Sequence, residues 1–288
     1  MRPAWSRIAL HGVFIGAIAA FLVLLLLYPF LPGAYDSLAM PLSMMVQIFG
    51  GVGILVVITA IPWLIYEVWN KRKRKSHYFA IVSMGTSTIV ALAVSLAAAA
   101  QFGLSLGVLS FTLWIVALMR WARRMTLLKT AETRRFNPAP VYLVLLPLIA
   151  LAGQILLAAP LTTSSRDHAI ANAAELVRDI ERHRAEFGSY PESLLAVWPD
   201  YLPAVTGIEK YNYAKSGESY NVSFEQPRFF FDIFGTREFV MYNPRDEQLM
   251  PSHASWILIW PAERIRTTQG WYASGDTGTP HWKYFRFD

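Results

Sequence analysis

Histidines and acids in the carboxyl-terminal part are the residues of this chain that could do chemistry. Imidazole is a common metal ligand and titrates near neutral pH, and four of the six histidines lie there: His168, His183, His253 and His281. None has a second histidine or an acid at the spacing typical of a zinc site. Asp276 and His281 are the nearest pair, but the "DTGTPHW" that holds them is typical of a turn entering a strand.

Motifs of nucleotide, hydrolase and metalloprotease sites are also absent from the sequence. It contains no Walker A loop, no G-x-S-x-G, no H-E-x-x-H and no G-x-G-x-x-G. It has no cysteine, which excludes disulfides and a thiol nucleophile. Calcium prefers several oxygen ligands, and "ASGDTGTPHW" offers one acid, Asp276. We therefore expect no catalytic residue, no cofactor and no metal, which weighs against an enzyme.

Composition indicates a multi-pass membrane protein. Hydrophobic residues make up 54% of the chain and charged residues 16%, where a soluble domain carries about 25% charge. Apolar stretches of about 20 residues are long enough to cross a bilayer. Five are present, at about residues 8–30, 42–68, 78–99, 102–119 and 141–159. The third and fourth adjoin at Gln101, Gly103 and Gly107, where a tight hairpin is expected.

Basic residues predict the orientation of these spans, because Lys and Arg in short loops stay cytoplasmic. Within residues 1–160 they lie only before the first span, between the second and third, and between the fourth and fifth. The main topology anchors are Lys71, Arg72, Lys73, Arg74, Lys75, Arg123 and Arg124. The opposite loop, "LPGAYDSLAM", has no basic residue. We expect a plasma (inner) membrane protein with a cytoplasmic amino terminus and a periplasmic or extracellular carboxyl-terminal domain.

Charge divides the chain into two expected domains. Residues 1–160 hold 13 basic and three acidic residues, whereas residues 161–288 hold 13 basic and 17 acidic ones. A nucleic-acid partner would need a basic face on the folded domain, so none is expected. "KRKRK" could bind anionic lipid or RNA, but its place beside a span is typical of a topology anchor. The expected partners are the lipid bilayer and either another envelope protein or a second copy of the chain.

The expected spans have no ionisable residue near their middle, where transporters and proton relays usually place one. His11 and Glu67 lie near span ends, where interfacial hydration explains them. The segments "GVFIG", "FGGVG" and "GLSLG" carry glycines on faces where helices can approach closely. These features predict a packed helical bundle and favour no transport activity.

The chain after Pro160 predicts an α+β domain in which one long helix packs on an antiparallel sheet. Ser164 or Ser165 is the expected N-cap of the helix, and Gly188 is placed as its left-handed C-cap. Apolar residues follow at helical spacing: Ile170, Ala173, Val177, Ile180 and Phe187. Six aromatic and β-branched runs then predict strands: "YNY", "SYNVSFE", "RFFFDIF", "REFVMY", "WILIW" and "HWKYFRF".

The order of these elements resembles the type IV pilins and the type II secretion pseudopilins. In that family an apolar membrane helix continues into a soluble helix, followed by a G-x-Y-P-x-S-L loop and an antiparallel sheet. The segment "GSYPESL" matches that loop, and the resemblance covers about residues 141–235. It implies that Gly188 caps the helix, that Tyr190 packs beneath it and that Pro191 starts the next turn.

The chain also departs from that family. Pilins have a short basic leader before the span and a glutamate near its start, whereas here "RRFNPAP" precedes the fifth span, which has no glutamate. The resemblance therefore implies the fold, without leader processing or fibre assembly. The absent motifs and intramembrane charges favour a membrane-anchored interaction or scaffold protein. The alternative is a membrane-embedded enzyme or carrier of an apolar or lipid-like substrate, with the external domain as a lid.

Overall fold

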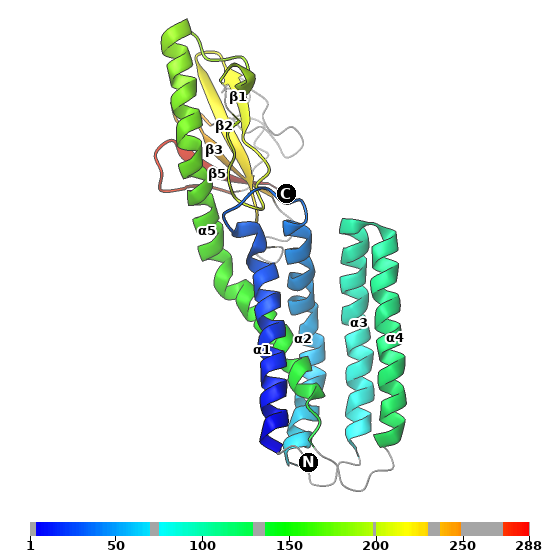
Figure 1. The fold of residues 1–288 in the computed structure, drawn as a ribbon. Helices are drawn as coiled ribbons and strands as arrows, with labels where there is room; N and C mark the ends of the chain where they lie inside the picture. Colours follow the sequence, from blue (N-terminus) through cyan, green and yellow to red (C-terminus); the bar gives the residue numbers. More distant parts are fainter. Residues whose placement is uncertain are drawn as a thin grey trace. The chain divides into compact units, whose positions relative to one another are not determined.

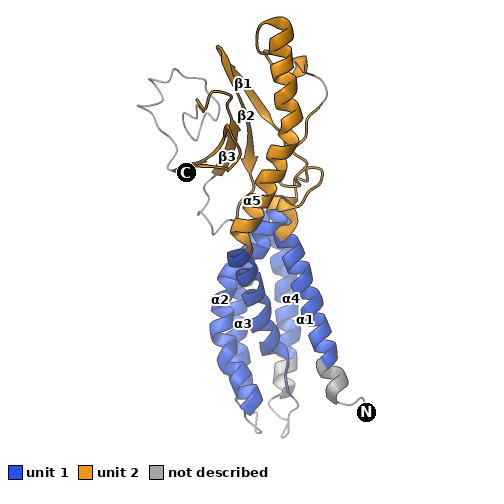
Figure 2. Cartoon of the chain, turned by 90° about the vertical axis from the view of Figure 1, so that its left-hand side faces the viewer, with its two compact units in different colours: residues 1–26, 41–156 blue, residues 27–40, 157–288 orange. Residues whose placement is uncertain are grey.

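A computed structural model of the protein describes residues 4–69, 75–128, 136–197, 200–229, 237–248 and 273–287 (Figure 1). The chain forms two compact units, which Figure 2 shows in blue and orange. Unit 1 comprises Met1–Leu26 and Pro41–Leu156, and unit 2 comprises Leu27–Met40 and Leu157–Asp288. The expected anchors Lys71, Arg72, Lys73 and Arg74 lie outside the described residues, as does the side chain of Arg124.

Long apolar helices form unit 1, as the composition predicts. The helices are α1 (Ala4–Leu27), α2 (Ala39–Trp69), α3 (Ser76–Phe102), α4 (Leu104–Leu128) and α5 (Ala139–Phe187), of which α5 continues into unit 2. All five are long and apolar enough to cross a membrane. The structure thus confirms five long apolar helices beside a separate antiparallel sheet.

Glycines let the helices of unit 1 approach one another closely. Gly103 alone separates α3 from α4, and the two helices run side by side (Figure 1). A Cβ at Gly107 would lie 2.5 Å from Ala99 Cβ, and one at Gly53 would lie 2.7 Å from Pro147 Cβ on α5. "GLSLG" and "FGGVG" are therefore packing faces. "GVFIG" differs, because no atom lies within 4 Å of a Cβ placed at Gly12 or Gly16.

Helix α5 is one continuous helix of 49 residues, so the expected N-cap at Ser164 or Ser165 is wrong. Ser165 lies in the helix interior, where its Oγ donates to the carbonyl of Thr162 at 3.2 Å. That bond to a preceding carbonyl is how serine is accommodated within a helix. The predicted apolar stripe is buried at Ile170, Ala173 and Ile180, but Phe187 is 69% exposed.

A five-stranded antiparallel sheet with the order β1-β2-β3-β5-β4 follows α5. The strands are β1 (Asn212–Ser216), β2 (Ser219–Gln226), β3 (Arg237–Tyr242), β4 (Ala273–Asp276) and β5 (Trp282–Phe287). Four match predicted runs, whereas β4 was not predicted, and only its last residue, Asp276, lies in the segment expected to be a turn. In "RFFFDIF", Arg228 and Phe229 are not in a strand and the rest lies outside the described residues, as "WILIW" does.

The core of unit 2 lies between α5 and one face of the sheet. Tyr220, Val222 and Phe224 alternate along β2 and are all fully buried, as the two-residue period of a strand requires. They pack in one cluster with side chains of α5, β3 and β5, among them Leu176, Ile180, Val240 and Trp282. The opposite face of the sheet carries a separate buried cluster of Phe239, Met241 and Phe285.

The loop between α1 and α2 also belongs to unit 2. Backbone hydrogen bonds tie it to the segment before β1, from Thr206 N to Leu31 O at 3.0 Å and from Gly33 N to Ala204 O at 3.0 Å. Pro32 and Val205 form an antiparallel bridge between these bonds. The sequence-based boundary at residue 160 omits this loop from the second domain.

Candidate functional site

Glu238 lies at the centre of a polar layer in unit 2. It stands on β3 directly opposite Gln226 of β2 and Arg286 of β5. Directly opposed residues of antiparallel strands have Cβ atoms about 5 Å apart on one face. Glu238 shares a face with Val240, two residues later, so its carboxylate lies on the side of the sheet that faces α5, with no exposed surface.

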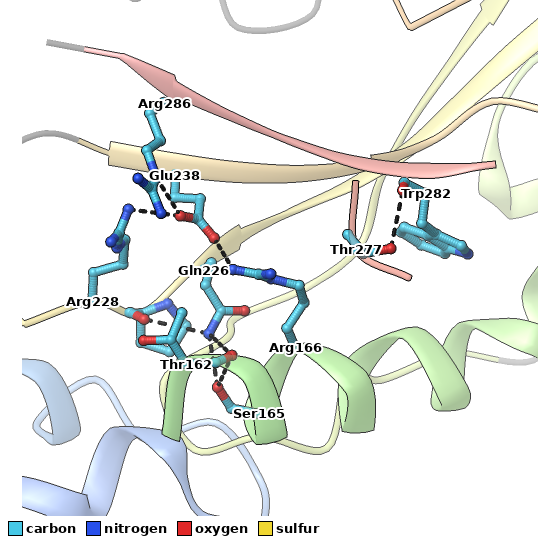
Figure 3. A network of polar contacts seen from close by, with 10 residues as sticks. Thr162, Ser165, Arg166, Gln226, Arg228, Glu238, Thr277, Trp282 and Arg286 are labelled. Carbon is cyan, nitrogen blue, oxygen red and sulfur yellow. Dashed lines mark hydrogen bonds and ion pairs between the residues drawn. The ribbon is translucent and has the colours of Figure 1, made fainter. Parts of the chain in front are cut away.

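Three guanidinium groups bind this one carboxylate (Figure 3). Arg166 of α5 donates from Nη2 to Oε1 at 2.5 Å, and Arg228 donates from Nη1 to Oε2 at 2.7 Å. Arg286 donates from Nε to Oε2 at 3.1 Å. The side chains of Arg166 and Arg228 are buried, whereas that of Arg286 is 29% exposed. We call these four residues the arginine–glutamate cluster.

Neighbouring side chains fix the positions of the arginines. The Arg166 and Arg286 guanidiniums lie 4.6 Å and 5.1 Å from the centroid of the Tyr284 ring, within the range of cation–π attraction. Gln226 Nε2 donates to Ser165 Oγ at 2.7 Å and to the carbonyl of Thr162 at 3.3 Å (Figure 3). Together with Gln226 of β2, the cluster therefore joins α5 to three strands of the sheet.

The cluster is suited to holding charge and not to transferring protons. Arginine stays protonated in proteins, and Glu238 is fully buried beneath its three partners. Removing one partner of a buried ion pair leaves an uncompensated charge, which is strongly destabilising. The arrangement can anchor the sheet to α5, and it can attract an anion.

The loop "GSYPESL" (residues 188–194), with Gly188, Tyr190 and Pro191, lies elsewhere in unit 2. Gly188 has φ +76°, and its N–H donates to Arg184 O at 2.8 Å, as a left-handed residue closing a helix does. Tyr190 is 4% exposed and accepts from Arg184 Nη1 at 2.7 Å. The carbonyl of Pro191 accepts from Tyr213 Oη at 2.7 Å. Gly188 follows Arg166 by about 30 Å of helix, so the structure does not bring this loop to the cluster.

The histidines do not converge in the part of the chain that the structure describes. His183 Nδ1 lies 3.1 Å from Ser189 O, and His281 Nδ1 lies 3.1 Å from Asp246 Oδ2. The partner of His281 is therefore Asp246, and Asp276 lies in β4. His253 falls outside the described residues. Among the described residues, no group of three His, Cys, Asp or Glu side chains is placed to hold a metal.

Burial raises the pKa values of tyrosines of unit 2, among them Tyr201, Tyr211 and Tyr220. Burial, aided by a hydrogen bond to Asp179, raises the pKa of Tyr201 to about 12. Burial also raises the pKa of Tyr211, whose hydroxyl donates to Ala169 O at 2.5 Å, and that of Tyr220, which bonds Glu181. These hydroxyls act as donors within the domain.

Sequence reasoning missed a second polar site, in unit 1. Glu67 is 3% exposed, so its expected hydration at an interface is wrong. It accepts from Trp63 Nε1 at 3.2 Å, from the hydroxyl of Ser76 and from the N–H of Asn137 at 3.4 Å. The bond to Trp63 lies within α2, whereas those to Ser76 at the start of α3 and to Asn137 before α5 appear only in the folded chain.

Comparison of the chain with protein-family models, with curated proteins and with solved structures finds no significant match.

Proposed function

We propose that this protein is a membrane-anchored interaction or scaffold protein of the cell envelope. Helix α5 carries this proposal, because one helix supplies an apolar segment and then the face on which an antiparallel sheet packs. That order of elements is the one for which the sequence resembles pilins and pseudopilins. The partner is another envelope protein or a second copy of the chain.

The proposed location is the plasma (inner) membrane, with the amino terminus in the cytoplasm and the pilin-like domain outside. The distribution of Lys and Arg supports this orientation. The contacts of Leu31 and Pro32 with Val205 and Thr206 give independent support. A loop and a domain that touch lie on the same side of a bilayer, and this loop is the one without basic residues.

Exposed apolar side chains mark where a partner would bind unit 2. Phe187, Leu195 and Leu202 are 69%, 86% and 61% exposed, whereas the apolar residues of the core are buried. Phe187 ends α5, and Leu195 lies in the short 3-10 helix η2 (Leu194–Ala196) that follows the pilin-like loop. Exposed leucine and phenylalanine gain free energy when a partner covers them.

An embedded enzyme or carrier is the second candidate. Glu67 favours it, because a buried carboxylate in an apolar bundle is a common mark of a functional site. In this alternative, unit 2 acts as a lid.

Site-directed crosslinking distinguishes the two proposed functions. Because the chain has no cysteine, an introduced cysteine is its single thiol. Leu195→Cys in the full-length protein, treated with a bifunctional thiol reagent or an amine–thiol reagent in native membranes, should give one discrete adduct. Its mass identifies a second copy or another envelope protein. Thr279→Cys, exposed in the turn after β4, is the control and should give none. Equal labelling without adducts at Phe187→Cys and Leu195→Cys would contradict an interaction role and favour the lid.

A further inference from the structure

We propose that the arginine–glutamate cluster of unit 2 binds orthophosphate or an equivalent phosphate group that carries a proton. This inference goes beyond the interaction function and does not depend on it, because it rests on a different part of unit 2.

The charge of the cluster favours an anion. Arg166 and Arg286 both bind Glu238, so even with Arg228 left aside two positive groups share one negative group. Charges in a buried environment interact more strongly than in water, and unbalanced ones are costly. An anion at this place would neutralise the excess. Guanidinium groups suit phosphate well, because their planar donors match its oxygens.

Unsatisfied hydrogen-bonding atoms show where such an anion would bind. Among the described residues, three buried atoms of this layer have no hydrogen-bond partner: Thr162 Oγ1, Arg166 Nε and Gln226 Oε1. The three residues are 5%, 8% and 3% exposed. Buried polar atoms are nearly always paired in folded proteins, so three orphans in one layer point to a missing partner.

The three residues that carry these atoms are neighbours in the fold. Thr162 and Arg166 are four residues apart on α5 and therefore lie on the same face, one turn from each other. Gln226 reaches this turn, since its Nε2 donates to the carbonyl of Thr162 (Figure 3). That use of Nε2 leaves Oε1 as the acceptor of the side chain.

The chemistry of the orphans selects the kind of anion. Arg166 Nε–H is a donor, and the Thr162 hydroxyl can donate to an oxyanion, whereas Gln226 Oε1 can only accept. A ligand that satisfies all three must carry both negative oxygens and an acidic hydrogen. Hydrogen phosphate has both at neutral pH. Sulfate, with the same shape and charge, has no hydrogen to donate to Gln226. The side chain of Arg286 is 29% exposed, so this member of the cluster is in contact with solvent.

Thermal unfolding of the full-length protein in neutral detergent tests the proposal. Sodium phosphate is titrated against sodium sulfate and sodium chloride at equal ionic strength. Phosphate should raise the unfolding midpoint along a saturating curve, and sulfate should do so much less. Arg286→Gln should weaken the apparent phosphate affinity at least about tenfold, because it removes one of the two positive charges that attract the anion. Arg286→Lys should fall between.

Arg237→Gln is the matched control. Arg237 also lies in the sheet, but it pairs with Glu225, and its side chain is 39% exposed. The Arg237→Gln protein should bind phosphate with the same affinity as the unchanged chain. A second arm replaces free phosphate with nanodiscs of phosphatidylcholine, with or without phosphatidic acid. A shift only with phosphatidic acid identifies a lipid headgroup as the source of the phosphate.

Three results would overturn the phosphate site. They are no saturable shift in either arm, equal shifts by phosphate and sulfate, and an Arg286→Gln protein that responds as the unchanged chain does. If Arg286→Gln fails to fold, the comparison of phosphate with sulfate on the unchanged chain still decides.

Discussion

Pro32 and Val205 face each other across an antiparallel bridge that joins the loop between α1 and α2 to the segment before β1. Stacking of Phe30 on Phe229, with ring centroids 4.8 Å apart, supports the same contact. Gly207 also leaves no space beside the loop, since a Cβ there would lie 2.5 Å from Pro29 O. This loop is thus an integral part of unit 2.

A disulfide across this bridge is the first prediction. Bridged residues in antiparallel pairs have Cα atoms about 5 Å apart, within the range of a disulfide. Pro32→Cys combined with Val205→Cys should therefore crosslink on mild oxidation, seen as a change in gel mobility that a reductant reverses. Pro32→Cys with Thr279→Cys is the control and should stay reduced. If the first pair gives no crosslink, the loop does not contact Val205 in the membrane-embedded protein.

The second prediction concerns the stability supplied by Glu238. Glu238→Gln removes a buried carboxylate from three arginines and should lower the free energy of unfolding of unit 2 by about 3–5 kcal/mol. Glu225→Gln is the matched control. The Glu225 side chain is 44% exposed, so losing its ion pair with Arg237 should lower the free energy of unfolding by about 1 kcal/mol or less. Denaturant titration followed by tryptophan fluorescence gives both values, and equal losses would argue against a structural role of the cluster.

The third prediction concerns the loop "GSYPESL", residues 188–194. Tyr190→Ala should cost about 3–5 kcal/mol, since its ring is buried and lies 4.7 Å from the ring of Tyr220. Tyr190→Phe should cost about 1 kcal/mol, the value of its hydrogen bond with Arg184.

Gly188→Val should cost about 1–2 kcal/mol from backbone strain alone, because no atom lies within 4 Å of an added Cβ. Glu186→Gln is the surface control, and Glu192 is avoided because it pairs with Lys215 at 2.5 Å. Unchanged unfolding midpoints for both Tyr190→Ala and Gly188→Val would show that this loop does not close the helix.

The fourth prediction is a loss of stability at high pH. Burial holds the pKa of Tyr211 and Tyr220 above the ordinary value of 10.0. The folded state then keeps protons that the unfolded state loses, so stability is complete below pH 10 and falls as the pH rises above it. The fall should be about 1.4 kcal/mol per pH unit for each tyrosine still protonated in the fold.

Chemical unfolding at a series of pH values, with tyrosinate absorbance recorded in parallel, measures this slope. Tyr211→Phe keeps the ring and removes one titrating group, so its stability should fall less steeply than that of the unchanged chain. A slope that the substitution leaves unchanged would contradict the assignment to Tyr211.

The fifth prediction concerns topology. A reporter active only outside the cytoplasm should be active when fused after Asp288 and silent when fused after Lys75, because basic loops stay inside. Activity after Lys75 with silence after Asp288 would overturn the five-span orientation.

Local pattern was sufficient to predict the helices and most strands. The apolar spans and the alternation in "SYNVSFE" and "REFVMY" depend on neighbours close in sequence, and the structure has helices and strands there. The predicted N-cap at Ser164 or Ser165 was wrong because α5 continues through Pro160, and Ser165 Oγ bonds the carbonyl of Thr162 inside the helix. Strand β4 was missed because "ASGD" has no strand-forming side chains and is held by pairing with β5.

The arginine–glutamate cluster could not be predicted from local pattern. Its four members come from α5, the segment after β2, β3 and β5, and they meet only through the pairing of the strands and the packing of α5 on the sheet. One signal was available. Glu238, Val240 and Tyr242 occupy alternate positions of one strand and therefore share one face. Glu238 is thus a charged residue at a position where the pattern predicts an apolar one.

Proline 160 gives α5 a mechanical property. It has no N–H, so the carbonyl of Leu156, the last residue of unit 1 in this helix, lacks its usual helical donor. Pro147 interrupts the bonding in the same way but is supported by close contact with Gly53. Leu156 is 72% exposed and has no such support. Under load, α5 should therefore bend near Pro160 before it bends near Pro147.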